Sequence, residues 1–257
     1  MSKQYNITYI LLRKILGFIL LSIFTSWIFI FTFFESVETN LYFSLILLFV
    51  FFFLTVRFLF EMRFNILSFD KIKPTHFLFE KSDFNDFFFV VLGSISTFVL
   101  NHIIGLNAIL ASGLIGLMGV LFFKKYAIPI FCGSFIAMAS STLPNINLVI
   151  IFASIIGGIV LVVCKDLFVG YGGKLGTIAF ISCIITGAIL NVPLFSTEHL
   201  ILDFDIMLIV YAVVGAILTY FISIKLNLGS VIASSTIGII SGFLLPLFYG
   251  TIGFTYA

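Results

Sequence analysis

The stretch GSISTFVLNHIIGLNAILASGLIGLMG, residues 93–119, decides the fold of this chain because it occurs twice. A shift of 122 positions aligns it without gaps, and eight of 24 positions are identical, where a composition rich in Ile, Leu and Phe gives about two by chance. The identical pairs are Gly93/Gly215, Ile95/Ile217, Thr97/Thr219, Leu106/Leu228, Ala111/Ala233, Ser112/Ser234, Ile115/Ile237 and Gly116/Gly238. Each copy reads as two apolar helices joined by a short break. The sequence therefore predicts an internally duplicated fold.

The composition indicates that the solvent of this chain is lipid. Its mean hydropathy is +1.28, with 61% hydrophobic and only 9% charged residues. Its apolar runs are continuous rather than alternating, and backbone groups in hydrocarbon must be paired within the segment, so the spans are helices. We expect an all-α polytopic membrane protein whose main partner is the lipid bilayer, with no nucleic-acid partner.

Nine apolar runs have lengths suited to a span of about 30 Å. They lie near residues 10–34, 40–60, 86–104, 106–123, 126–143, 147–164, 175–193, 205–224 and 228–249. When the ends of successive runs are assigned alternately to the two sides of the membrane, all 13 basic residues fall on one side. The other side then holds Glu35, Glu38, Glu198, Asp203 and Asp205. The excess of Lys and Arg predicts a multi-pass protein of the cell inner (cytoplasmic) membrane, with a cytoplasmic N-terminus and an external C-terminus.

The nine runs suggest four segments. Residues 1–60 form a transmembrane hairpin, 61–85 a cytoplasmic or interfacial linker, 86–193 a five-helix repeat unit, and 205–257 a partial second repeat. The first copy follows Lys81 on the cytoplasmic side and the second follows Asp205 on the external side, so the repeat is inverted. Either another subunit or a homo-oligomer completes the second repeat, or the chain is a fragment, or only a helix pair was duplicated.

Inverted repeats are typical of secondary transporters, because two similar halves of opposite orientation can exchange conformations around one site. The sequence thus predicts a transporter of a small polar solute. A channel, or a non-catalytic subunit of a membrane assembly completed by a partner, is the alternative. We expect no enzyme, since no HExxH, GxSxG, kinase or dinucleotide motif and no carboxylate cluster is present.

The second helix of each copy carries small residues four apart. This spacing lets helices approach closely in lipid, so Ser112 and Gly116, like Ser234 and Gly238, are expected to form a packing face. The same crossing would present hydroxyls to a solute near the midplane. The candidate substrate-binding residues here are Ser112, Ser234, Ser235 and Thr236.

The fifth run, residues 126–143, contains Pro129 and Gly133 and is rich in hydroxyls. An interrupted helix points to a transporter's binding site, so Ser134, Ser140 and Ser141 are further substrate-binding candidates. In the alternative interpretation, Pro129 is a harmless first-turn proline. Ser140 and Ser141 then belong to an external turn.

Residues 170–177, GYGGKLGT, form a candidate anion site in which glycine N–H groups and Lys174 face a carboxylate. A flexible turn whose lysine reaches the lipid headgroups is the alternative. Asp166 is expected to pair with Lys165 or Lys174. His102 is the proton-coupling candidate, against the alternative of an interfacial histidine that meets water.

Bound cofactors and metals are not expected. Cys132, Cys164 and Cys183 lie in apolar segments without metal-binding spacing. No carboxylate lies in the middle of an expected helix. Solute exchange, or coupling through hydroxyl and carbonyl oxygens, therefore fits better than a carboxylate proton relay.

Residues 92–119, LGSISTFVLNHIIGLNAILASGLIGLMG, resemble the threonine/serine exporter family. The match consists of a Leu-Gly-Ser-Ile start and an Ala-Ser-x-x-x-Gly-x-x-Gly helix, here Ala111, Ser112, Gly116 and Gly119. It covers about a tenth of the chain. The chain departs from the family in having no long soluble N-terminal region and only part of a second half. The resemblance implies amino-acid transport, namely export of small polar amino acids, and assigns no individual binding residue.

Overall fold

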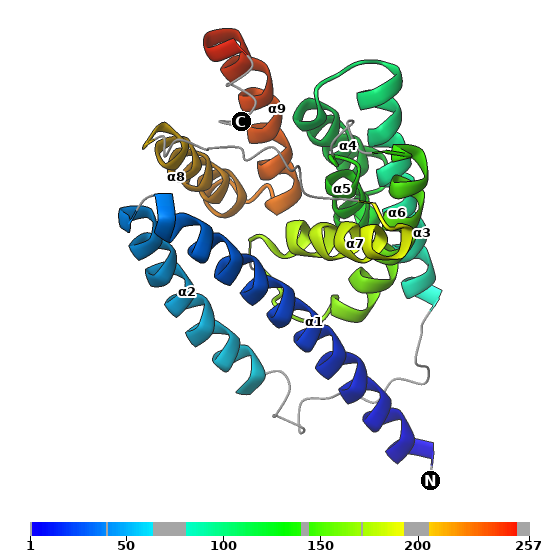
Figure 1. Ribbon diagram of the computed structural model, residues 1–257. Coiled ribbons are helices and arrows are strands. Elements are labelled where there is room, and N and C mark those ends of the chain that lie inside the picture. Colours follow the sequence, from blue (N-terminus) through cyan, green and yellow to red (C-terminus); the bar gives the residue numbers. More distant parts are fainter. Residues whose placement is uncertain are drawn as a thin grey trace. The chain divides into compact units, whose positions relative to one another are not determined.

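The computed structural model describes residues 2–39, 41–63, 81–139, 144–170, 172–192 and 206–250. Within them the chain forms helices joined by turns and no strand, which confirms the all-α class (Figure 1). The α-helices are α1 Ser2–Thr39, α2 Leu41–Glu61, α3 Lys81–Phe98, α4 Ala108–Phe122, α5 Ala127–Ile136, α6 Ile146–Cys164, α7 Lys174–Leu190, α8 Ile206–Tyr220 and α9 Ser230–Tyr249. The short elements are the π-helical turns η3 Val99–Ile103 and η5 Phe221–Lys225 and the 3-10 turn η4 Lys124–Tyr126.

Five helical segments are long and apolar enough to cross a membrane. They are Leu11–Val37, Leu41–Glu61, Lys81–Ile103, Ile146–Cys164 and Ser230–Tyr249. Shorter apolar helices cover Ala108–Phe122, Lys174–Leu190 and Ile209–Lys225. These findings fit a membrane protein, and nine crossings remain a prediction. Helix α5, with 10 residues, is shorter than the expected run and extends only about 15 Å.

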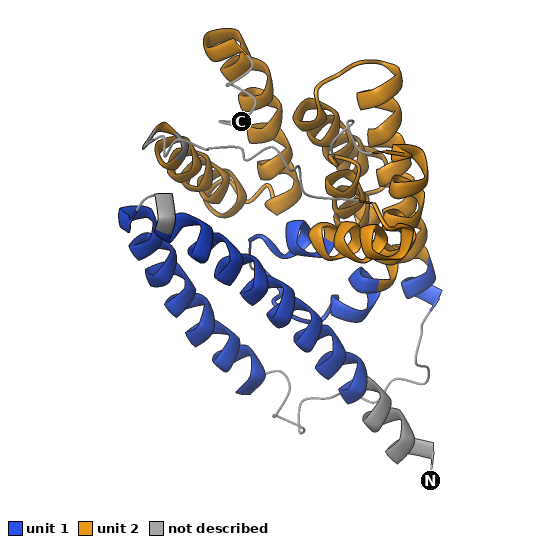
Figure 2. Ribbon diagram, viewed as in Figure 1, with its two compact units in different colours: residues 1–84, 160–178 blue, residues 85–159, 179–257 orange. Residues whose placement is uncertain are grey.

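The chain forms two compact units (Figure 2). Unit 1 comprises residues 1–84 and 160–178, and unit 2 comprises residues 85–159 and 179–257. In unit 1, α1 and α2 form a hairpin that contacts the turn after α6. The ring of Phe168 in this turn lies 6.1 Å from that of Phe18 on α1 and 5.3 Å from that of Phe58 on α2.

The sequence repeat corresponds to a repeat of local backbone structure in unit 2. A shift of 122 residues places η3 on η5 and the first residue of α4 on the first residue of α9. The same hydrogen bond closes each π-turn, from Ile104 N to Val99 O at 3.1 Å and from Leu226 N to Phe221 O at 3.2 Å. Each copy is therefore a helix, a π-turn, a short break and a second helix.

Helices α4 and α9, which are equivalent in the two copies, pack against each other in antiparallel fashion. The start of α4 meets the second half of α9, where Asn107 Nδ2 donates to Gly242 O at 2.9 Å. In the middle of α4, a methyl group added at Gly113 would lie 3.0 Å from Ser235 O. Gly113 and Ser235 are equivalent positions in the two copies, so α4 and α9 cross at the same position of the repeat. The two helices pack together as expected, but α9 does so through Ser235 and Gly242, whereas Ser234 and Gly238 of the expected packing face are only half-buried.

Helix α5 packs between the two helices of the first copy. A methyl group at Gly93 of α3 would overlap Ile130 O, and one at Gly119 of α4 would lie 3.1 Å from the Ile130 side chain. A methyl group at Gly133 would overlap Val90 O. These close approaches bury eight of the 10 residues of α5. Unit 2 thus has a short central helix enclosed by the first copy of the repeat.

Candidate functional site

The polar residues of unit 2 whose side chains are buried as a whole are all serines and threonines among the residues that the structure describes. They are Ser94, Thr97, Ser112, Ser134, Ser154, Ser182, Thr186 and Ser235. Some of these hydroxyls bond a carbonyl of their own helix. Thr97 Oγ1 donates to Gly93 O at 2.9 Å, and Thr186 Oγ1 to Ser182 O at 2.7 Å. A hydroxyl that is satisfied in this way needs no ligand.

Ser112 of α4 and Ser134 of α5 join their helices through a hydrogen bond of 2.8 Å between the Oγ atoms. Ser134 Oγ also donates to Phe131 O at 2.8 Å. A hydroxyl has one proton, so Ser112 must donate to Ser134. The Ser112 oxygen therefore keeps acceptor capacity in a buried position.

Ser235 of α9 is fully buried, and its Oγ finds no hydrogen-bond partner within the described chain. It lies against the same part of α4, because a methyl group at Gly116 would overlap Ser235 Oγ and come within 2.7 Å of the Phe131 ring. Gly116 is one turn beyond Ser112. We call Ser112, Ser134 and Ser235 the serine site. It offers an acceptor at Ser112 and, at Ser235, a hydroxyl that no described residue bonds.

Asn107 fixes the relation between the two helices at one edge of this site. Its Oδ1 accepts from Leu110 N at 2.7 Å and caps α4, while its Nδ2 donates to Gly242 O. The Gly242 carbonyl is available because Pro246, four residues later, has no N–H to donate to it. The proline in α9 therefore creates an acceptor that the asparagine of α4 uses.

The remaining serine and threonine candidates lie differently. Ser234 and Thr236 flank Ser235 on α9 and are half-buried. Ser140 and Ser141 lie outside the described residues. Pro129 is the third residue of α5, so the interpretation as a harmless first-turn proline is confirmed.

His102 lies in η3, the π-turn of the first copy. Its ring centroid is 4.4 Å from that of Phe98, and its Nε2 is buried with no hydrogen-bond partner in the described part of the chain. The proton-coupling role of His102 remains a prediction.

Lys174 lies in unit 1, where its ammonium donates to Lys165 O at 3.0 Å and Leu167 O at 2.7 Å. These carbonyls follow the last turn of α6, where a cation is favourable. The anion-binding role of Lys174 remains a prediction.

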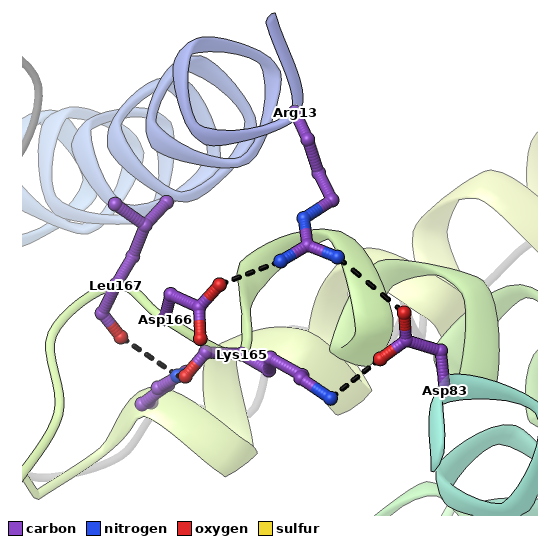
Figure 3. A network of polar contacts seen from close by, with 6 residues as sticks. Arg13, Asp83, Lys165, Asp166 and Leu167 are labelled. Carbon is purple, nitrogen blue, oxygen red and sulfur yellow. Dashed lines mark hydrogen bonds and ion pairs between the residues drawn. The ribbon is translucent and has the colours of Figure 1, made fainter. Parts of the chain in front are cut away.

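A network of four charged side chains surrounds the same turn (Figure 3). Asp83 is 2% exposed and pairs with Arg13 at 3.5 Å and Lys165 at 2.5 Å. Arg13 also pairs with Asp166 at 2.6 Å. The expected pairing of Asp166 with Lys165 or Lys174 is wrong, because Arg13 of α1, 153 residues away, takes its place.

Two features of unit 2 were missed at the level of sequence. Ser94 of α3 is fully buried and its Oγ has no partner among the described residues, although nothing in its apolar context distinguishes it. The contact of Asn107 with Gly242 could in part have been predicted from the sequence. A proline four residues after a glycine in an apolar helix leaves the glycine carbonyl without its helical hydrogen bond.

The described residues contain no group of His, Cys, Asp and Glu that could hold a metal ion. Comparisons with protein-family models, curated proteins and solved structures find no match for this chain.

Proposed function

We propose that this chain acts as a secondary transporter of a small polar solute, which binds at the serine site. The observation that carries the proposal is the antiparallel packing of α4 and α9 at equivalent positions, with a buried hydroxyl at the crossing that has no partner among the described residues. Two equivalent helices of opposite direction can exchange environments around one site, which is the basis of alternating access. A buried hydroxyl without a partner costs about 1–3 kcal/mol, a cost that a bound solute would relieve.

The chemistry of the site favours a solute without net charge. The buried polar residues of unit 2 are serines and threonines within the described chain, and none is a charged residue. An uncompensated ion in such a place costs several kcal/mol. A neutral or zwitterionic molecule that both donates and accepts hydrogen bonds matches Ser112 and Ser235. Threonine or serine, which the family resemblance suggests, has these properties, and export is the direction that the resemblance implies.

Transport by reconstituted protein tests this proposal. We expect proteoliposomes to exchange labelled threonine or serine, and Ser112→Ala and Ser235→Ala to lower the rate by roughly three- to tenfold, the value of one hydrogen bond. Ser154→Ala is the matched control, because this buried hydroxyl donates to Ile151 O of its own helix at 2.8 Å. Equal losses in all three variants, or no loss at Ser112 and Ser235, would exclude the serine site.

The inverted arrangement has its own test. Leu106 and Leu228 are equivalent positions in the breaks of the two copies. We expect single cysteines at these positions to react with a membrane-impermeant maleimide from opposite sides of the membrane, with position 228 on the cytoplasmic side. Labelling of both from one side would contradict the inverted topology and, with it, the alternating-access mechanism.

A further inference from the structure

The ring of Phe131 on α5 lies beside the hydroxyl of Ser235. Phe131 is 5% exposed, and its Cδ2 and Cε2 atoms come within 2.7 and 2.9 Å of a methyl group added at Gly116. The same methyl group would overlap Ser235 Oγ, so the ring and the hydroxyl meet over one residue of α4. A phenyl ring has no hydrogen-bonding atom. Its presence leaves the Ser235 hydroxyl without a bond within the described chain.

Ser112 lies one helical turn before this contact, on the same face of α4. Cβ positions four residues apart on a helix are about 5–6 Å apart, so the Cβ atom of Ser112 and the Ser235 hydroxyl are separated by roughly that distance. This separation is too long for a direct hydrogen bond. It matches two O–H···O bonds of about 2.7–2.8 Å placed end to end. One small polar group of a bound molecule would therefore bond both serines.

We propose that Phe131 closes the serine site, and that the solute enters by displacing its ring. Phenylalanine has two common χ1 rotamers in a helix, so the ring can leave Gly116 while α4 and α5 stay in place. Phe135, one turn later, contacts this ring with centroids 4.5 Å apart and is only half-buried, so the pair extends from Gly116 to a less covered part of α5. The inference rests on the proposed solute site and adds the residue that controls access to it.

The reactivity of a cysteine at position 235 reports whether Phe131 covers the site. The full chain, in nanodiscs, carries Ser235→Cys together with Cys132→Ala, Cys164→Ala and Cys183→Ala. Methyl methanethiosulfonate, a small neutral reagent, is the probe, and the mass of the intact chain gives the extent of modification. With Phe131 in place we expect slow modification, because residue 235 is fully buried.

Two substitutions of Phe131 remove the cover in steps. Phe131→Val lacks the two ring atoms that meet Gly116 but keeps an apolar side chain. We expect it to accelerate the modification roughly tenfold, equivalent to about 1.4 kcal/mol less free energy of opening. Phe131→Leu, which retains δ carbons, should give an intermediate rate, and it preserves the test if the smaller side chain prevents folding.

Ile130→Ala is the matched control. Ile130 is 2% exposed on the same helix, but it contacts Gly93 and Gly119 instead of Gly116. We expect this substitution to leave the reactivity of position 235 unchanged. Equal acceleration by Ile130→Ala and Phe131→Val, or no acceleration by either substitution of Phe131, would overturn the inference.

Protection by threonine separates this inference from the proposed function. In the Phe131→Val chain, saturating threonine should slow the modification of position 235, because it fills the space beside Ser112. Acceleration by Phe131→Val without protection by threonine or serine would support the closing role of Phe131 and contradict the proposed solute.

Discussion

The two units hold their helices together by different means. Unit 1 uses charged side chains, with Asp83 between Arg13 and Lys165, and the buried Glu61 accepting from Phe168 N at 2.7 Å. Unit 2 uses glycines that let backbones touch and hydroxyls that bond across or within helices. A charge removed from water needs a partner in place, whereas a hydroxyl can be buried unpaired at moderate cost. In unit 1 the charged side chains are therefore bonded to one another or to backbone, whereas the serines of unit 2 retain capacity for further hydrogen bonds.

The largest effect that tests this contrast is expected at Asp83. Asp83→Asn leaves Arg13 and Lys165 facing a neutral side chain in a largely buried place, and we expect a loss of about 2–4 kcal/mol of unfolding free energy. Asp166→Asn removes a carboxylate that is 44% exposed and should cost about 0–1 kcal/mol. Denaturant unfolding in detergent compares the two. Equal losses would show that burial of the carboxylate does not decide the strength of this network.

The next effect compares equivalent glycines. Gly93→Ala places a methyl group on Ile130 O and should cost about 1–3 kcal/mol, because backbone atoms cannot move aside as a side chain can. Gly215→Ala places its methyl group where no described atom lies within 4 Å. Since alanine favours a helix interior over glycine, it should add about 0.5–1 kcal/mol. The melting temperatures of the two variants should therefore shift in opposite directions, and shifts of the same sign would argue against close packing around α5.

A third, smaller effect concerns the edge of the serine site. Asn107→Ala removes the cap of α4 and the bond to Gly242, and we expect a loss of about 1–2 kcal/mol. In a Pro246→Ala background, the new N–H can satisfy Gly242 O, so the same substitution should cost about 1 kcal/mol less. A double-mutant cycle measures this coupling. A cost of Asn107→Ala that is independent of residue 246 would show that the proline does not supply the acceptor.

The sequence supported some features of unit 2 because they depend on local patterns. The identities at a shift of 122 anticipated the equivalence of η3 with η5, and the small residues around Ser112 and Ser234 anticipated the α4–α9 contact. Local spacing was sufficient because an interhelical seam in lipid selects small side chains on one helix face.

Other features depend on contacts between distant parts of the chain. Asp166 had lysines close by in sequence, and only the packing of α1 in unit 1 brings Arg13 to it. Helix α5 ends at Ile136, although apolar and small residues continue beyond that point. Hydropathy registers the apolar character of such a segment but not the position of its last helical turn.

The smallest change in stability is expected at Ser235. This variant gives the sharpest contrast between the buried polar groups of unit 2 and the structural charges of unit 1. The Oγ of Ser235 has no partner among the described residues, so Ser235→Ala removes the cost of an unsatisfied buried group but leaves a small void; because the two effects largely offset, the unfolding free energy should change by only about 0–1 kcal/mol, in the stabilising direction. The same variant should lose transport if the serine site is correct. Stability from denaturant unfolding and exchange rate from proteoliposomes should therefore change independently. A clear loss of stability would instead show that Ser235 bonds a group of the folded protein, and it would then belong with Asp83 among the structural polar residues.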